Sequence, residues 1–456
     1  SRATEGGWRD DVAFLVGDRS FTHADVHDAA ARTGALLAAA GVGPGERVLI
    51  ALPDGIEFVW AFVGAVRIGA VAVPVNPRLT EADHRRAAAG AAAVVCATDL
   101  AGRFAGRVLV AEDLEDAIAG QPPAPAAPVT AEQAAYAQFT SGTTGTPKEA
   151  RHGHGHPPVY VEAFARQAIN IRSDDVLLSV SKLYFAYGLG NSLFFPLLTG
   201  CRAVLHAGHP RPDEIAEVVA RHRVTVLFSV PTFFAHLVAG GRRADMASVR
   251  VAVSAGEALG VELAQRARAF FGCPILDGIG STEVGQTFAS NTLSECRDGT
   301  VGRALPPYRV EVRDGVLWVA GPTLPLDHAG EWLCTGDRAV VDGDGFLHLQ
   351  GRVDDVEQVG GISVSPLEIE AVLCRHPAVT EVAVAGVVDA EGASRLEAFV
   401  VAGGPPGDLE AELIALARAE LAPFKVPRAV HLVDALPRTP TGKLRRFVLR
   451  QANRST

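Results

Sequence analysis

The sequence has few features of a secreted, metal-binding or membrane-spanning protein. Its six cysteines are scattered and form no C-x-x-C pair, which favours reduced thiols over a disulfide framework or a zinc site. No signal peptide precedes Trp8. The most apolar span, residues 58–75, contains Arg67 and Pro74, so a helix followed by a buried strand explains it better than a membrane helix. We therefore expect a cytoplasmic protein with no membrane partner.

An excess of basic charge is also missing. The formal net charge is −10, and basic runs are short, the densest being residues 443–446. This charge balance argues against a nucleic-acid or anionic-membrane partner. With 456 residues, of which 48% are hydrophobic, the chain is too long for one core and should form two or more domains.

No Walker phosphate loop, G-x-x-x-x-G-K-[ST], is present, because no Gly-Lys-Ser/Thr triplet occurs in the chain. Residues 139–148, F-T-S-G-T-T-G-T-P-K, instead place hydroxyl side chains and two glycines ahead of Lys148. Backbone N–H groups in such a glycine-rich turn form a concave nest for anions, and Lys148 adds a charge suited to phosphate. The alternative is an ordinary polar turn, but the donors favour a polyphosphate ligand.

The apolar runs alternate between helix and strand patterns. Before the glycine-rich stretch, the predicted strands are 48–52, 70–75, 92–97 and 108–111, and the predicted helices begin near Thr22 and cover 57–67 and 80–89. After it, the predicted strands are 175–179, 202–205, 224–230 and 249–254, with helices 213–223 and 261–271. Strands separated by helices indicate βαβ units. Short strands after residue 300 predict a β-rich subdomain, and residues 355–456 a compact α/β unit.

The order T-S-G-T-T-G-x-P-K resembles the phosphate-binding signature of adenylate-forming enzymes: acyl- and aryl-CoA ligases, adenylation domains and luciferases. Four further motifs follow in the family's order: D-G-I-G-S-T-E at 277–283, T-G-D at 335–337, G-R-x-D…G…V-x-P-x-E-I-E at 351–370, and P-T-G-K at 440–443. The resemblance implies an α/β fold. A large N-terminal domain, residues 1–352, would contain doubly wound βαβ subdomains and the β-rich subdomain. A small mobile α+β C-terminal domain, residues 353–456, would hinge at Asp354.

The chemistry implied by this resemblance is acyl activation. Attack of a carboxylate on the α-phosphate of ATP gives an acyl-adenylate and pyrophosphate, and a nucleophile then displaces AMP. The transition state at phosphorus needs positive charge that is placed in advance. The implied cofactors are ATP, Mg²⁺ and coenzyme A, or the phosphopantetheine of a carrier protein.

Motif positions imply the roles of individual residues. The phosphates would be held by Thr140, Ser141, Gly142, Thr143, Thr144, Gly145 and Lys148. The adenine side of the nucleotide site would be formed by Gly256, Glu257, Ala258, Asp277, Gly278 and Ile279, and ribose would be bound by Asp337 and Arg352. Thr282 would contact the α-phosphate, and Glu283 would help to hold Mg²⁺, which prefers oxygen ligands. Lys443 would act in adenylation, while Gly360 and Gly361 would serve thiol transfer. Taken singly, such residues are also helix caps, surface ion pairs or exposed lysines.

Several segments resemble benzoate-CoA-ligase-like enzymes in particular, namely residues 182–191, 254–259 and 277–283. In that group the positions of Ala186, Tyr187 and the residues after the motif glutamate face the aromatic ring. Here V-G-Q-T stands at 284–287, where those enzymes typically have bulkier apolar residues followed by His-Ile. We expect Gly285 to make room and Gln286 to supply hydrogen bonds. Together with Gly280, these residues predict a pocket for a substituted or larger aryl acid.

Other departures concern rate and acceptor. Glu149 replaces the usual glycine and would place negative charge near the triphosphate, Gln358 stands where lysine is common, and the connection 322–332 is short.

Three functions are consistent with the sequence. The first is an aryl-CoA ligase. The second is the same adenylation with transfer to a carrier protein, an amine or another nucleophile. The third is a non-catalytic nucleotide-binding relative, which the motif residues, including Lys443, disfavour. We expect a monomer or a homodimer.

Three alternating histidines follow the glycine-rich stretch. His152, His154 and His156 could share one face of a strand, as metal ligands do. No acidic or cysteine partner lies nearby in the sequence, and family members often carry histidine at the first and third of these positions. We therefore do not predict a metal site here.

Overall fold

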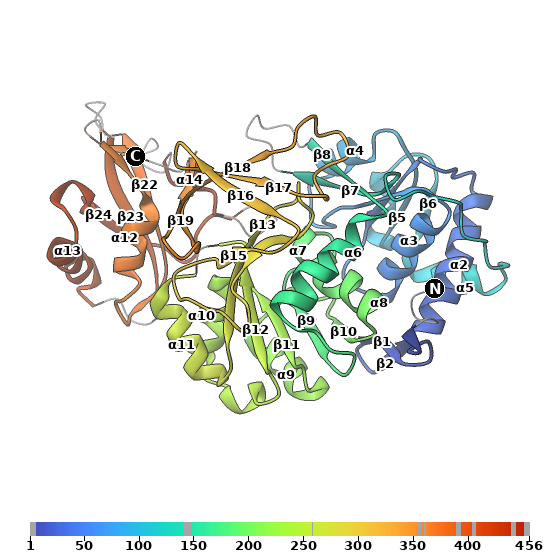
Figure 1. Cartoon of the computed structure of the whole chain (residues 1–456), viewed down its shortest axis with the longest axis horizontal. Helices are drawn as coiled ribbons and strands as arrows, with labels where there is room; N and C mark the ends of the chain where they lie inside the picture. The colour runs from blue at the N-terminus through green and yellow to red at the C-terminus, as the bar shows by residue number, and fades with distance from the viewer. Residues whose placement is uncertain are drawn as a thin grey trace.

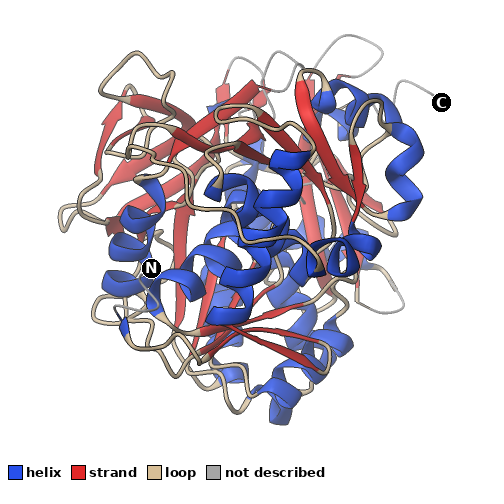
Figure 2. Cartoon of the chain, turned by 90° about the vertical axis from the view of Figure 1, so that its right-hand side faces the viewer, coloured by secondary structure: helices blue, strands red, loops and turns tan. Residues whose placement is uncertain are grey.

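The structure, a computed structural model, describes residues 6–140, 148–257, 259–353, 357–359, 362–388, 394–403, 407–438 and 444–450. Its sheets have nine, six, four and three strands, with a further two-stranded hairpin. In Figure 1 the N-terminal helices lie at one end of the molecule and the C-terminal residues at the other. Figure 2 shows helices packed against the sheets, so the predicted α/β fold class is confirmed.

The six-stranded sheet has the order β6-β5-β3-β4-β7-β8, and β3 pairs in parallel with β4 and β5. Its strands are β3 (Arg47–Ala51), β4 (Val71–Pro74), β5 (Ala91–Cys96), β6 (Val108–Val110), β7 (Ala134–Thr140) and β8 (Lys148–Gly153). The first four were predicted, because each is a short buried apolar run. β7 and β8 are antiparallel and place Thr140 opposite Lys148.

The helices of this region are α2 (His23–Ala39), α3 (Ile56–Arg67), α4 (Glu81–Ala88) and α5 (Leu114–Ala119). α2 begins as predicted, with a capping box. The Thr22 hydroxyl accepts from the Asp25 N–H, and the Asp25 carboxylate accepts from the Thr22 N–H. Residues 121–128, which contain four prolines, run over α2 and α3. There the Ala124 N–H donates to Ala31 O, and the Ala127 N–H donates to Arg67 O.

The nine-stranded sheet has the order β15-β14-β13-β12-β11-β9-β10-β1-β2. Its strands are β1 (Val12–Val16), β2 (Arg19–Thr22), β9 (Val176–Ser179), β10 (Arg202–Leu205), β11 (Val226–Ser229), β12 (Val251–Ala255), β13 (Ile275–Gly280), β14 (Thr287–Ser290) and β15 (Arg303–Ala304). The N-terminal strands join this sheet rather than the first, with Phe14 opposite Ala203 in a parallel pair. No strand was predicted at residues 12–22, because this pairing depends on a partner about 190 residues away in the sequence.

Both faces of the central strands are buried, as parallel strands require. Phe228 and Val253 belong to one core, and Leu227 and Ala252 to the other. The second face is covered by α9 (Pro212–His222), α10 (Pro231–Gly240) and α11 (Val261–Phe271). The first face packs against α6 (His156–Tyr160), η3 (Val161–Ala168), α7 (Ala186–Leu189), η4 (Gly190–Phe194) and α8 (Phe195–Thr199). Except for α9 and α11, these helices were not predicted.

The predicted β-rich subdomain is the antiparallel sheet of β16 (Arg309–Arg313), β17 (Val316–Ala320), β18 (Leu333–Val341) and β19 (Leu347–Arg352). The C-terminal elements are β20 (Glu357–Val359), β21 (Ile362–Val364), α12 (Pro366–Leu373), β22 (Val379–Val388), β23 (Ser394–Ala402), α13 (Leu409–Glu420), β24 (Ala429–Leu432) and α14 (Arg446–Leu449). They enclose a core of their own around Ile369, Leu396 and Leu413. The domain boundary near residue 353 and the mobility of this unit stay predictions.

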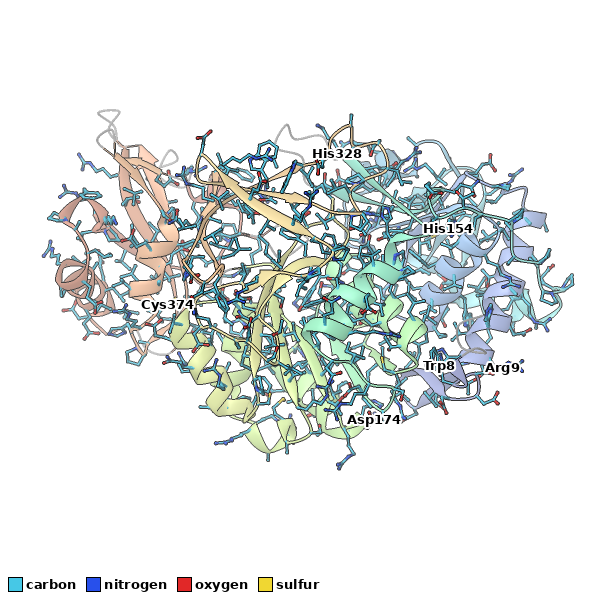
Figure 3. All side chains as sticks on the ribbon, in the orientation of Figure 1. Trp8, Arg9, His154, Asp174, His328 and Cys374 are labelled. Atoms are coloured by element: carbon cyan, nitrogen blue, oxygen red, sulfur yellow. The ribbon has the colours of Figure 1, made fainter. Side chains whose placement is uncertain are left out.

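The C-terminal unit contacts the nine-stranded region through α11. Cys374, directly after α12, lies where the two regions meet (Figure 3), and Arg375 forms an ion pair with Glu262 of α11 at 3.1 Å. Within the described ranges, no helix combines the length and apolar character needed to cross a membrane.

Candidate active site

The predicted adenine-side residues Gly256, Glu257 and Asp277 lie on or directly after β12 and β13, toward the carboxyl ends of these strands. Ligands of open α/β sheets bind at this edge. Ser229, Ser254 and Asp277 lie side by side in register on the three parallel strands β11, β12 and β13, and all three are buried. Within the described part of the chain, neither serine hydroxyl nor Oδ1 of Asp277 has a hydrogen-bond partner. A row of unpaired buried polar groups is costly unless a ligand or water completes it.

Asp277 is the most perturbed acid of the site. Burial raises the pKa of its carboxyl group to about 8, although the nearby Ser254 hydroxyl and the backbone of Leu259 and Gly278 favour the anion. The Ser254 hydroxyl lies close without hydrogen-bonding geometry to Oδ1. No cation pairs with this carboxylate among the residues that the structure describes. The group is therefore suited to a ligand that brings a hydrogen-bond donor.

The turn that follows β13 carries the predicted Thr282 and Glu283. Gly285 N–H donates to Ser281 O at 2.9 Å, and Val284 N–H donates to the Ser281 hydroxyl at 3.2 Å, which closes residues 281–285 into a tight turn. Glu283 is half-buried. The turn thus holds Glu283 a few residues after the end of β13, the strand that carries Asp277.

Two residues outside the motif hold this turn. His152 Nε2 lies 2.9 Å from Thr282 O, and the Thr323 hydroxyl donates to Val284 O at 2.9 Å. Neither contact was predicted. His152 attracted attention only as a member of the alternating histidines, and Thr323 had no sequence signal.

The alternating histidines do not share one face. His152 is buried in β8, and its Nδ1 lies 3.3 Å from Nδ1 of His156 at the start of α6. His154 lies in a different environment, where its Nε2 has no partner within the described residues (Figure 3). No group of three or more His, Cys, Asp or Glu side chains suited to a metal ion occurs in the described ranges.

The predicted acid-binding residues lie on the opposite face of β12 and β13 from Asp277. The Tyr187 hydroxyl donates to Val253 O at 3.1 Å, and its ring meets Phe228 edge-on. Burial raises the pKa of Tyr187 well above its ordinary value, and the Asp277 carboxylate adds to this effect. Ala186 is buried at the start of the same helix, α7. Tyr187 therefore lies near Asp277 across the sheet.

Gln286 is also buried and is held by neighbours. Its Oε1 accepts from Thr287 N–H at 2.9 Å, and its Nε2 donates to Asn191 Oδ1 at 3.5 Å. A Cβ on Gly190 would meet this Nε2 at 1.7 Å, so any larger residue at 190 would displace the Gln286 amide from this position. Asn191 was not assigned a role from the sequence, yet its Nδ2 is buried without a partner in the described ranges.

The glycines assigned to the site differ in what a side chain at each position would contact. A Cβ on Gly285, whose φ is +88°, would meet Tyr160 Oη at 2.1 Å and His152 Cε1 at 3.0 Å. The missing side chain thus accommodates Tyr160, and the expectation that Gly285 also makes room for the acid stays a prediction. Gly278 and Gly280 likewise face protein atoms of β14 and of Gln286, at 3.0 and 2.7 Å. Among the residues that the structure describes, a Cβ on Gly256, whose φ is +91°, would have only Val230 nearby, at 3.6 Å.

Glu257 connects the adenine side to the C-terminal unit. Its carboxylate accepts from the Thr232 hydroxyl at 2.7 Å and forms an ion pair with Arg438. The same guanidinium donates to Glu381 of β22 at 2.8 Å, and Glu381 lies 3.3 Å from His236 of α10. Arg438 was not singled out in the sequence, because an arginine in a loop has no pattern of its own.

Two further predicted residues meet on the β-rich subdomain. Asp337 and Arg352 are partners in the β18–β19 ladder, and Arg352 Nη1 lies 3.3 Å from Asp337 Oδ1. Arg352 Nη1 also donates to Thr335 O at 3.0 Å. The arginine therefore orients the carboxylate that was assigned to ribose.

Ile279, which was also assigned to the nucleotide site, is buried on β13.

Glu149 does not face the phosphate site as a free charge. Its carboxylate pairs with Arg47, and Arg151 Nε lies 4.0 Å away. Both members of the Arg47 pair are largely buried, with 16% and 22% of their side chains exposed. Lys148, by contrast, is exposed at the start of β8. The expected unfavourable charge near the triphosphate is thus neutralised within the chain.

Some predicted residues lie outside the described ranges. These are Ser141, Gly142, Thr143, Thr144, Gly145, Ala258, Asp354, Gly360, Gly361 and Lys443. The side chain of Gln358 is also outside them. Their assignments stay predictions from the sequence.

Family comparisons agree with this geometry. The family described as AMP-binding enzyme matches residues 2–343, and the AMP-binding enzyme C-terminal domain matches residues 368–443. The p-hydroxybenzoic acid–AMP ligase FadD22 of Mycobacterium marinum is 43% identical over 98% of this chain and 68% of that protein. The benzoate–CoA ligase of Thauera aromatica is 37% identical over 92% of this chain and 88% of its own.

Solved structures show the same fold. The anthranilate CoA ligase AuaEII, in complex with anthranoyl-AMP, superposes with a TM-score of 0.93 at 30% identity, over 98% of this chain and 95% of that chain. The prediction of an enzyme of the AMP-forming ligase class is confirmed. This chain therefore belongs to the AMP-binding enzyme family, with benzoate–CoA ligases and related aryl-AMP ligases among its relatives.

Proposed function

We propose that this enzyme activates a benzoate-class carboxylic acid by adenylation with ATP and transfers the resulting aroyl group to a thiol, which forms a thioester and releases AMP. The observation that carries the proposal is the placement of two sets of residues on opposite faces of one strand, β13. Asp277 lies on the face covered by α10 and α11, and Tyr187 packs on the other face. The Glu283 turn continues from the end of that strand. A nucleotide and an acid bound on the two faces would meet at this turn.

The residues fit ATP in one respect that the structure describes directly. Oδ1 of Asp277 is a buried acceptor without a partner among the described residues. An adenine amine would supply the missing donor and offset the cost of burial. Gly256, at the end of the neighbouring strand, has a Cβ position that no described residue approaches closer than 3.6 Å.

The donor set near the turn also fits Mg²⁺, provided that the substrate supplies further oxygens. Mg²⁺ is commonly bound by one or two carboxylates together with phosphate groups. Glu283 would be that carboxylate, and the cation would neutralise phosphate charge. Thr282 would bind the α-phosphate, Asp337 the ribose hydroxyls, and Lys443 the incoming carboxylate.

The acid side favours an aryl group. Tyr187 and Phe228 form an aromatic wall, and Gln286 and Asn191 place amide groups beside it. The Asn191 side chain interacts with Tyr187, and its Nδ2, which meets no hydrogen-bond criterion within the described residues, would donate to a polar ring substituent. Relatives named for benzoate and p-hydroxybenzoic acid support this class of substrate.

There are two candidate acceptors for the aroyl group. The CoA ligases support coenzyme A. The relative with the higher identity, 43% against 37%, is named as an acid–AMP ligase without CoA, so we keep the phosphopantetheine of a carrier protein as the second candidate. Both use the same first half-reaction.

The test is acid-dependent pyrophosphate release with benzoate, hydroxybenzoates, anthranilate, cinnamate and a C12 fatty acid. We expect a benzoate-class acid to give the highest kcat/KM, and the fatty acid as best substrate would refute the proposal. Glu283→Gln should abolish release, whereas Glu295→Gln, at an exposed position outside the site, should not. The adenylate is then offered to CoA and to a phosphopantetheinylated carrier protein in competition, which separates the two acceptors.

A further inference from the structure

The carbonyl groups on either side of Glu283 are each held by a buried side chain. His152 binds Thr282 O, and Thr323 binds Val284 O, both at 2.9 Å. His152 and Thr323 are fully buried. They come from β8 and from the connection after β17, so two segments remote in sequence bind adjacent parts of one turn.

Each of these side chains is supported by buried tyrosine. Tyr160 Oη lies 3.3 Å from His152 Nδ1, and Tyr136 Oη lies 2.9 Å from Tyr160 Oη. The Tyr136 ring also stacks on His152 with centroids 4.8 Å apart. On the other side, Tyr308 Oη lies 2.9 Å from the Thr323 hydroxyl.

The two carbonyl oxygens fix which group donates each hydrogen bond in these two chains of side chains. A carbonyl oxygen only accepts, so His152 must carry its proton on Nε2 and Thr323 must donate its own. In a neutral ring the Nδ1 of His152 is then an acceptor, which Tyr160 or His156, each 3.3 Å away, can satisfy. Thr323 is free to donate because Tyr308 can donate to it. Burial favours this neutral ring, since it lowers the pKa of His152 to about 3.

We propose that the chains Tyr136–Tyr160–His152 and Tyr308–Thr323 are positioning residues, which fix the Thr282–Glu283 turn in the geometry that adenylation requires. This inference rests on the proposed adenylation. Thr282 and Glu283 would contact the reacting phosphate and its cation, whereas His152 and Thr323 act only through the backbone. A displacement of about 1 Å in such a group can lower a rate by about 100-fold.

The glycine of the turn supports the same conclusion independently. A Cβ on Gly285 would collide with Tyr160 Oη and crowd His152, so the turn and the first chain are shaped to each other. The close fit leaves no room between the turn and the ring that holds it.

The first test compares His152→Leu, which removes the donor, with His152→Gln, whose Nε2 can replace it. His84→Leu is the matched control. His84 is equally buried and bonds a backbone carbonyl, Asn76 O, at 3.0 Å, but it lies on α4 away from the turn. We expect kcat for pyrophosphate release to fall about 10- to 100-fold in His152→Leu, with the KM for ATP changed less than threefold. His152→Gln should recover most of the loss, and His84→Leu should show none.

The second chain is tested with Thr323→Val, which keeps the shape and removes the hydroxyl. Its control is Thr33→Val, because Thr33 is also buried and donates to a carbonyl, Ala29 O, at 2.8 Å. Thr323→Val should lower kcat about tenfold, and Thr323→Ser should restore it.

A readout without turnover separates this inference from the proposed function. Amide hydrogen exchange at residues 281–285 should accelerate in His152→Leu and Thr323→Val, but not in either control. If wild-type enzyme releases no pyrophosphate with any acid while exchange responds as expected, the proposed function fails and the anchoring stands. Unchanged exchange and kcat in His152→Leu, or equal losses in His152→Leu and His152→Gln, would overturn the inference.

Discussion

Replacing Asp277 with asparagine should stabilise the nucleotide-free protein, and the effect should grow with pH. The substitution keeps the shape of the side chain and removes its titration. A carboxyl group whose pKa is about 8 in the folded state, against an ordinary 3.8, contributes stability below pH 4 that is lost as pH rises through 8. The asparagine variant has no such loss.

The magnitude follows from the interval between the two pKa values. At 1.36 kcal/mol per pKa unit, the interval between 3.8 and about 8 corresponds to a loss of about 6 kcal/mol in the free energy of unfolding above pH 8. This loss is an upper bound, because water that enters the site stabilises the buried charge. We expect Asp277→Asn to raise the free energy of unfolding by about 2–4 kcal/mol at pH 8.5 and by less than about 1 kcal/mol at pH 4.5.

Urea unfolding followed by tryptophan fluorescence measures this difference. All four tryptophans precede residue 353, so the signal reports the N-terminal region that contains Asp277. Asp174→Asn, at an exposed position (Figure 3), is the control and should change stability equally at both pH values. An Asp277→Asn effect that is the same at pH 4.5 and 8.5, or a loss of stability at pH 8.5, would refute the reasoning.

Three further predictions concern single residues. Glu149→Gly should leave the ATP Michaelis constant unchanged within twofold at low salt, because Arg47 already neutralises this carboxylate; a clear decrease would mean that Glu149 acts on the triphosphate. Gly285→Ala should lower kcat for pyrophosphate release at least tenfold through its clash with Tyr160, without a change in the preferred acid; a shift toward smaller acids would instead show that Gly285 lines the acid pocket. Lys443→Ala should reduce pyrophosphate release about 10²- to 10³-fold and spare transfer from synthetic aryl-adenylate to the acceptor, and equal loss of both half-reactions would contradict an adenylation role.

Local patterns predicted a large part of the fold. The capping box at Thr22 and Asp25 marked the start of α2, and short apolar runs marked β3, β4, β10 and the strands of the β-rich subdomain. Helices whose apolar residues lack a clear period were missed, among them α10, which is rich in buried phenylalanine. Such helices are buried on several sides, so their sequence does not separate an inner face from an outer one.

The family and the chemistry of the motifs were evident from the sequence alone, because motif residues are close together in the chain and their spacing is read directly. Glu283, Asp277 and Asp337 were assigned their roles in this way. The residues that hold the Glu283 turn and the ion-pair partner of Glu149 were not found, since Thr323, the buried histidine–tyrosine chain and Arg47 come from strands and loops that only the tertiary fold brings together.

Gly285 and Glu149 illustrate the same division. The sequence by itself determined that a glycine and a carboxylate stand at these positions, and it suggested space and a repulsive charge. Only the tertiary structure decided that Tyr160 fills the space and that Arg47 neutralises the charge. The physical reason is that packing and electrostatics depend on distances between atoms, and a neighbour more than about 100 residues away leaves no local pattern at the position that it contacts.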